Sequence, residues 1–170
     1  PYTTLFRSGE GRYDEAVARY EKALEINPDN QNILFLLGRE LAAMGREEAF
    51  SFLRANIPDI QLPEEKHEQE LEILEGDDCK LKFTRVETDE DGESDEYVYE
   101  FMVSDIHEGN SEISVDGMLV EVILQTAGNE ELIKPYENGE VEDFEDEFTI
   151  YADDVRLARM ILSAFGAFSD

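Results

Sequence analysis

A Gly-Arg pair occurs twice in the first third of the chain, at Gly11 and at Gly45, a spacing of 34 positions. Between them, apolar residues recur with a period of 3.6 residues, so that they form one stripe of a predicted amphipathic helix. The stripe consists of Ala16, Tyr20, Ala23 and Leu24. Asn27-Pro28 ends this helix, because the residue before a proline avoids the α region. The spacing therefore predicts successive helices over about 10–26, 30–44 and 46–56.

The motif positions of the second helix are Leu34, Leu37, Gly38 and Leu41. Together with the 34-residue period, they make residues 9–57 resemble the tetratricopeptide repeat (TPR) family of helix–turn–helix units. The third helix departs from the pattern, since Ala49 and Leu53 fit only if one residue is missing before them. A generic helical hairpin is the alternative. The resemblance implies a non-enzymatic protein that binds other proteins or acts as a scaffold.

In the repeats that this stretch resembles, the first helix of each unit lines a concave groove that holds a peptide. The corresponding residues here are Asn32, Phe35, Arg39 and Ala42, which share one helix face. The family's clamp for a C-terminal carboxylate has Lys and Asn where this chain has Phe35 and Arg39, so binding of chaperone tails is not implied. Alternatively, Phe35 covers a helix that lies further upstream.

Residues 1–8 read as the translation of a DNA-sequencing adapter, as in a metagenomic fragment, and are expected to contribute nothing to the core. The chain would then begin inside a repeat, with the natural protein longer at its N-terminus. Nothing in the sequence indicates a cellular compartment.

The net charge is −29, and most acidic residues lie beyond Leu62. This asymmetry predicts two units joined by a linker over 58–76, with a short helix at Pro63–Glu75. So negative a chain is expected to bind no nucleic acid, phosphoinositide or anionic membrane surface. The charge is either a solvated surface, suited to a salty habitat, or a docking surface for a basic partner.

From residue 77 the apolar period changes to two, which predicts strands. Seven short strands are expected, followed by a helix over about 153–168 that Asp153 caps. Cys79 is expected to be a buried strand residue. The order of elements is similar to the pleckstrin-homology-like barrel, and Tyr97–Ile106 and Phe148–Arg159 resemble a small bacterial domain of unknown function. The fold class is therefore α+β, with an open sheet crossed by the helix as the alternative.

Carboxylates are plentiful, so a hydrolase, or a subunit of one, that uses a buried acidic pair is the alternative function. Ser104, Asp105 and His107 have triad residue types but lack a nucleophile-elbow pattern. The loop Glu87–Asp95 resembles a calcium loop, yet Val98 stands where the bidentate Glu belongs. We expect no metal, cofactor or catalytic residue, and we interpret His67 as part of a glutamate-rich helix face.

Overall fold

The computed structural model describes residues 45–74 and 80–169, together with residues 19, 22, 23 and 26. Those four isolated residues are helical. The expected helix over 30–44, most of the helix over 10–26, the adapter-like residues 1–8 and Cys79 lie outside the described residues.

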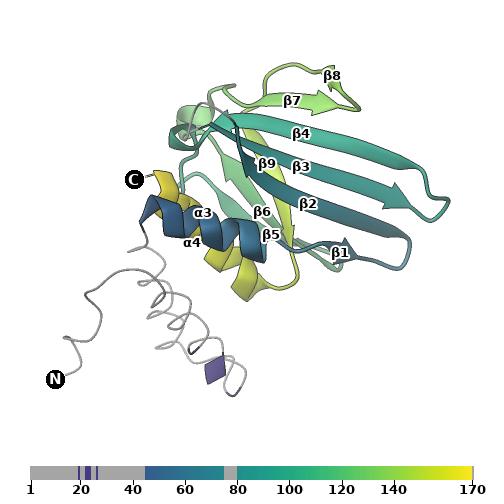
Figure 1. Ribbon diagram of the computed structural model, residues 1–170, viewed down its shortest axis with the longest axis horizontal. Coiled ribbons are helices and arrows are strands. Elements are labelled where there is room, and N and C mark those ends of the chain that lie inside the picture. The colour runs from purple at the N-terminus through teal and green to yellow at the C-terminus, as the bar shows by residue number, and fades with distance from the viewer. Residues whose placement is uncertain (1–18, 20–21, 24–25, 27–44, 75–79, 170) are drawn as a thin grey trace.

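Two α-helices and nine strands make up the continuous described part (Figure 1). The helices are α3 (Arg46–Asn56) and α4 (Val155–Ser169). The strands are β1 (Ile60–Gln61), β2 (Glu65–Ile73), β3 (Lys80–Asp89), β4 (Ser94–Met102), β5 (Glu112–Asp116), β6 (Leu119–Gln125), β7 (Lys134–Glu137), β8 (Glu140–Val141) and β9 (Glu147–Ala152). Short 3-10 helices lie at Val103–Asp105 and Ala127–Asn129.

The strands form two antiparallel sheets. The larger has the order β1-β2-β3-β4-β7-β8, and the smaller has the order β5-β6-β9. Seven of the nine strands, β3 to β9, lie beyond residue 79, which is the number expected there. β1 and β2 precede them and extend the larger sheet, and the pleckstrin-homology-like arrangement is not confirmed. The coarser expectation of antiparallel sheets with a C-terminal helix is confirmed.

The largest local error of the sequence interpretation concerns Pro63–Glu75, where a short helix was expected. Residues 65–73 form β2 instead, paired along its length with β3. Glutamates at even positions face solvent, while His67, Gln69 and Leu71 face inward. The apolar–polar alternation typical of a strand could not be seen in the sequence, because two of the three inward-facing residues are polar.

Two hairpin turns follow their sequence signals. Asn138-Gly139 joins β7 to β8 with positive φ at both residues, 50° and 83°, as the favoured two-residue turn requires. Gly117 turns between β5 and β6 with φ 59°.

An aromatic cluster fills the space between the sheets. Phe101 lies at its centre, with ring centroids 4.7 Å from Phe148 and 6.4 Å from Phe165 of α4. Phe83 and Tyr99 extend the cluster along β3 and β4 through contacts with Phe148. These rings pack together with the aliphatic core residues between the two sheets.

The two helices lie side by side on one flank of the sheets (Figure 1). α4 covers the smaller sheet through Ala158, Ile161, Ala164 and Phe165, all fully buried. α3 contacts β2 and α4, and its Ala49 and Leu53 are also fully buried. No described helix is long and apolar enough to cross a membrane.

The cap of α4 is Asp154 rather than the expected Asp153. The Leu157 amide donates to Asp154 Oδ1 at 2.7 Å, and the Ala158 amide donates to the Asp154 carbonyl at 3.0 Å. An N-cap side chain satisfies an amide that has no partner inside the helix. The position of Asp154 one residue before Val155 therefore fixes where the helix begins.

Replacing Asp154 with alanine is expected to lower the free energy of unfolding by about 1 kcal/mol, the usual effect of losing an N-cap. Urea unfolding followed by circular dichroism measures this change. The neighbouring Asp153→Ala is the matched control, with an expected change below about 0.5 kcal/mol. A larger loss for Asp153→Ala than for Asp154→Ala would contradict the assignment.

Candidate functional site

The peptide-groove residues expected from the sequence are Asn32, Phe35, Arg39 and Ala42, and all four lie outside the described residues. The proposed groove therefore keeps the status of a sequence prediction. The described residues hold a different concentration of polar chemistry, at the seam where the two sheets meet.

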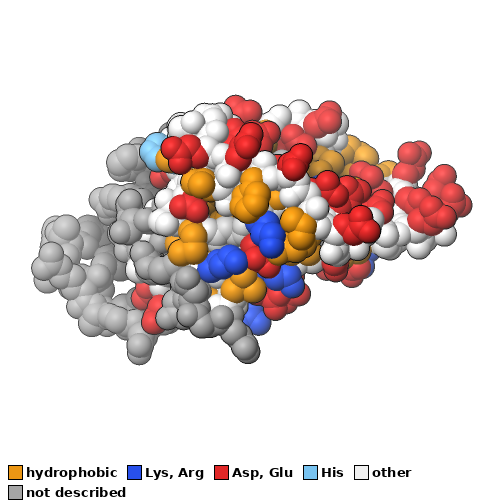
Figure 2. Space-filling model, turned by 90° about the horizontal axis from the view of Figure 1, so that it is seen from above, with side chains coloured by type: hydrophobic (Ala, Val, Ile, Leu, Met, Phe, Trp, Pro, Cys, Tyr) orange, Lys and Arg blue, Asp and Glu red, His pale blue; other side chains and the backbone are white. Residues whose placement is uncertain are grey.

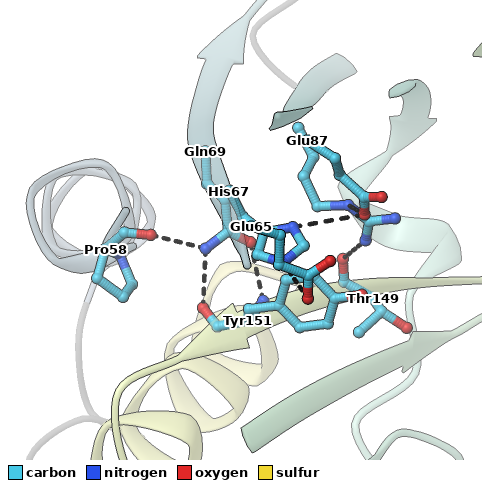
Figure 3. Close-up of polar contacts among 8 residues, drawn as sticks. Pro58, Glu65, His67, Gln69, Glu87, Thr149 and Tyr151 are labelled. Carbon is cyan, nitrogen blue, oxygen red and sulfur yellow. Dashed lines mark hydrogen bonds and ion pairs between the residues drawn. The ribbon is translucent and has the colours of Figure 1, made fainter. Parts of the chain in front are cut away.

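At the seam, the side-chain amide of Gln69 occupies the position that a neighbouring strand would take along the edge of β9. Within the described residues β9 pairs with β6 alone, so the other edge of β9 has no neighbouring strand. Gln69 of β2 fills this place: its Nε2 donates to the Tyr151 carbonyl at 3.0 Å, and its Oε1 accepts from the Tyr151 amide at 2.8 Å. The same Nε2 donates to the Pro58 carbonyl at 2.7 Å, which attaches the segment just before β1 to β2 (Figure 3).

Arg85 of β3 makes a second polar contact between the two sheets, two residues before Tyr151 along β9. The arginine residue is only 8% exposed, and Nη1 donates to the Thr149 carbonyl at 3.1 Å. Nε lies 2.9 Å from Glu87 Oε1, which compensates the buried charge. The guanidinium carbon lies 5.1 Å from the ring centre of Tyr97 and 4.8 Å from that of Tyr151. Arg85 is thus held between two tyrosines, a favourable cation–π arrangement.

His67 is buried beside this arginine and lies on a strand, contrary to the interpretation that placed it on a glutamate-rich helix face. It is 2% exposed, and its ring meets the edge of Tyr151 at 4.8 Å. Its nitrogens lie 3.2 Å from Glu65 Oε1 and 3.5 Å from Glu87 Oε1 (Figure 3). Neither nitrogen makes a hydrogen bond among the described residues. Because the ring is enclosed, it is poorly placed to exchange protons with a substrate.

A cleft of about 360 Å³ opens beside Arg85. It is lined by Arg85, Tyr99, Glu145, Asp146, Glu147, Phe148, Thr149 and Tyr151. The inner face of the larger sheet supplies one wall, and the segment that leads into β9 supplies the other. Sequence analysis missed this cleft, although Arg85 continues the apolar alternation of Leu81 and Phe83, a detectable signal for an inward-facing charge.

Burial and like charges shape the electrostatics of the cleft. Burial raises the pKa of Tyr99 and of Tyr151, and the Arg85 charge partly opposes both shifts. Glu145 also has a raised pKa, first because of partial burial and then because of the neighbouring carboxylates of Glu147 and Asp146. The cleft therefore presents negative charge that its own residues only partly neutralise.

These carboxylates do not form the acidic pair that the hydrolase alternative requires. A catalytic pair needs two carboxyl groups that are buried and convergent. Glu145 and Glu147 are both exposed at the surface, and Glu147 accepts a hydrogen bond from Gln125 Nε2 at 3.2 Å. Asp105 has a pKa raised by burial, but Ser104 and His107 beside it are exposed.

The loop that resembles a calcium site is a hairpin turn. Asp89 Oδ1 accepts hydrogen bonds from the Asp91 and Glu93 amides, each at 2.9 Å. Gly92 has φ 82°, the left-handed conformation that the turn needs. Asp89 occupies the third position of that loop pattern, and its carboxylate is thus committed to organising the backbone.

Comparison with known protein families finds a TPR repeat over residues 10–45. This match covers about a fifth of the chain and coincides with the stretch where the 34-residue spacing was found. No curated protein and no solved structure matches the chain. The match supports a role in protein–protein interaction, which is the typical and generally non-enzymatic role of TPR repeats.

Proposed function

We propose that this chain is a non-enzymatic interaction or scaffold protein that binds a peptide segment of a partner through its TPR groove. The observation that carries the proposal is the TPR match over residues 10–45. The described β domain supports it indirectly, since its raised-pKa carboxylates do not form a buried catalytic pair.

The groove chemistry follows from residue types on one helix face. Asn32 offers an amide donor and acceptor to a peptide backbone. Phe35 provides an apolar surface, and Arg39 can bind a carboxylate through two parallel hydrogen bonds. Their spacing of three and four residues places them together in an α-helix. The ligand that fits is an extended or helical peptide with an apolar residue near an acidic one.

Replacing Phe35 and Arg39 together with alanine is expected to weaken binding of such a peptide at least tenfold, because both side chains contact the ligand in the proposed groove. Affinity is measured by a peptide pull-down and then by calorimetry with the captured peptide. Circular dichroism spectra of variant and wild type must superimpose, so that a loss of binding reports on contact and not on unfolding.

The matched control removes two exposed side chains from α3, through Glu47→Ala and Arg54→Ala. This variant should bind the peptide as the wild type does. If the groove variant keeps its fold and all its partners, the groove assignment is wrong.

A further inference from the structure

We propose that the cleft beside Arg85 is a second docking site, which binds an arginine side chain presented by a basic peptide of a partner protein. The site belongs to the β domain and shares no residue with the proposed TPR groove. The sequence left open whether the negative charge is a solvated surface or a docking surface for a basic partner. This proposal takes the second alternative and assigns it to a specific cleft.

Three aromatic residues are part of the lining of the cleft. Tyr99 stacks on Phe148 with ring centroids 5.3 Å apart and an interplanar angle of 22°, so its ring is fixed in orientation. Tyr151 is half-buried and held through its backbone by Gln69. Rigid, partly desolvated tyrosine faces attract organic cations, and a planar guanidinium can stack on them.

The structure already contains one guanidinium held by tyrosine rings and a carboxylate, that of Arg85. Arg85 lies between the rings of Tyr97 and Tyr151, with Glu87 as its charge partner. A second guanidinium entering the cleft would meet the same combination of groups, with Tyr99 as the ring and Glu145 as the carboxylate.

The charge of the rim selects a cation. Glu145, Asp146 and Glu147 follow one another along the entrance, and their mutual repulsion contributes to the raised pKa of Glu145. A positively charged side chain would relieve that repulsion. Figure 2 shows that acidic side chains also cover the end of the molecule that carries the β3–β4 hairpin, which adds to the negative potential that attracts a basic partner.

The volume of the cleft and the arrangement of its acidic side chains favour an organic cation over a metal ion. Among the residues that the structure describes, no group of three His, Cys, Asp or Glu side chains is arranged to hold a metal. A cleft of about 360 Å³ has the size of a site for a small organic group, at the lower end of the usual range. An arginine side chain combines planarity, charge and the donor geometry that carboxylates accept.

The test uses the whole chain and the peptide acetyl-Ala-Arg-Ala-Arg-Ala-amide at low and at physiological ionic strength. Calorimetry should detect saturable binding that weakens as salt is added. Tyrosine ring signals in NMR spectra should shift for Tyr99 and Tyr151. Tyr136 lies on the opposite face of the sheet, where Lys134 Nζ sits 4.7 Å from its ring centre, so its signal should stay unchanged.

Replacing Glu145 and Glu147 together with glutamine should weaken this binding at least tenfold, because the cleft then loses both rim charges while each side chain keeps its shape. The matched control is Glu90→Gln with Glu93→Gln at the exposed tip of the β3–β4 hairpin, which removes the same charge. The control should retain affinity within twofold of the wild type.

Three results would overturn the proposal. The first is no saturable binding of the arginine peptide, and the second is an equal loss of binding in the tip control, which would indicate charge attraction without a site. The third is equal affinity for the matching lysine peptide or for free arginine amide, which would remove the preference for a peptide-borne guanidinium. None of these results depends on Phe35 or Arg39, so they leave the TPR proposal intact.

Discussion

Replacing Phe101 with alanine is expected to lower the free energy of unfolding by about 3–5 kcal/mol. Phe101 is 1% exposed and joins three elements, since its ring contacts Phe148 of β9 and Phe165 of α4 from its place on β4. Truncation would remove the contacts that attach the small sheet and the C-terminal helix to the large sheet. Equilibrium urea unfolding, fitted with a common slope, measures the effect.

The matched control for that loss is Phe144→Ala, which removes the same atoms from a side chain that is 50% exposed. Its expected cost is below about 1 kcal/mol, because little packing is lost. Similar losses for the two variants would contradict the aromatic cluster as the centre of the core.

Replacing Gln69 with alanine is expected to cost about 2–3 kcal/mol, because the amide and carbonyl of Tyr151 and the carbonyl of Pro58 all lose their partner. The seam should open locally before the molecule unfolds. Native-state hydrogen exchange would report this as faster exchange of the Tyr151 amide.

Gln61→Ala provides the control for the loss of a glutamine amide. Gln61 is exposed, and its Nε2 donates to the nearby carbonyls of Leu62 and Glu65. We expect a change below about 0.5 kcal/mol and unchanged exchange at Tyr151. If Gln69→Ala behaves in the same way, the Gln69 amide does not hold the two sheets together.

Most strands of the β domain could be predicted because their apolar residues alternate. In β6, the alternating residues Val120, Val122 and Leu124 are buried, and the residues between them are partly exposed. Turn signals at Gly117 and Gly139 placed two hairpins correctly. These features are local, since alternation and turn chemistry depend on residues only a few positions apart.

β2 could not be predicted in this way. Its inward side carries His67 and Gln69, which are polar residues with no reason to face a core until their partners are known. Both contact Tyr151 of β9, which lies 82 residues away from Gln69 along the chain. Residues so distant in sequence leave no periodic signal in a single chain.

By itself, the sequence determined the TPR stretch, the change from helical to strand periodicity, the excess of acidic residues and the amphipathic C-terminal helix. Only the tertiary structure decided how the strands divide into two sheets, that Gln69 and Arg85 close the edge of β9, and that a cleft with tyrosine walls opens beside them. The physical reason is that periodicity and turn preference act over a few neighbouring residues. The partner of a buried polar group, in contrast, is set by which distant strands the fold brings together.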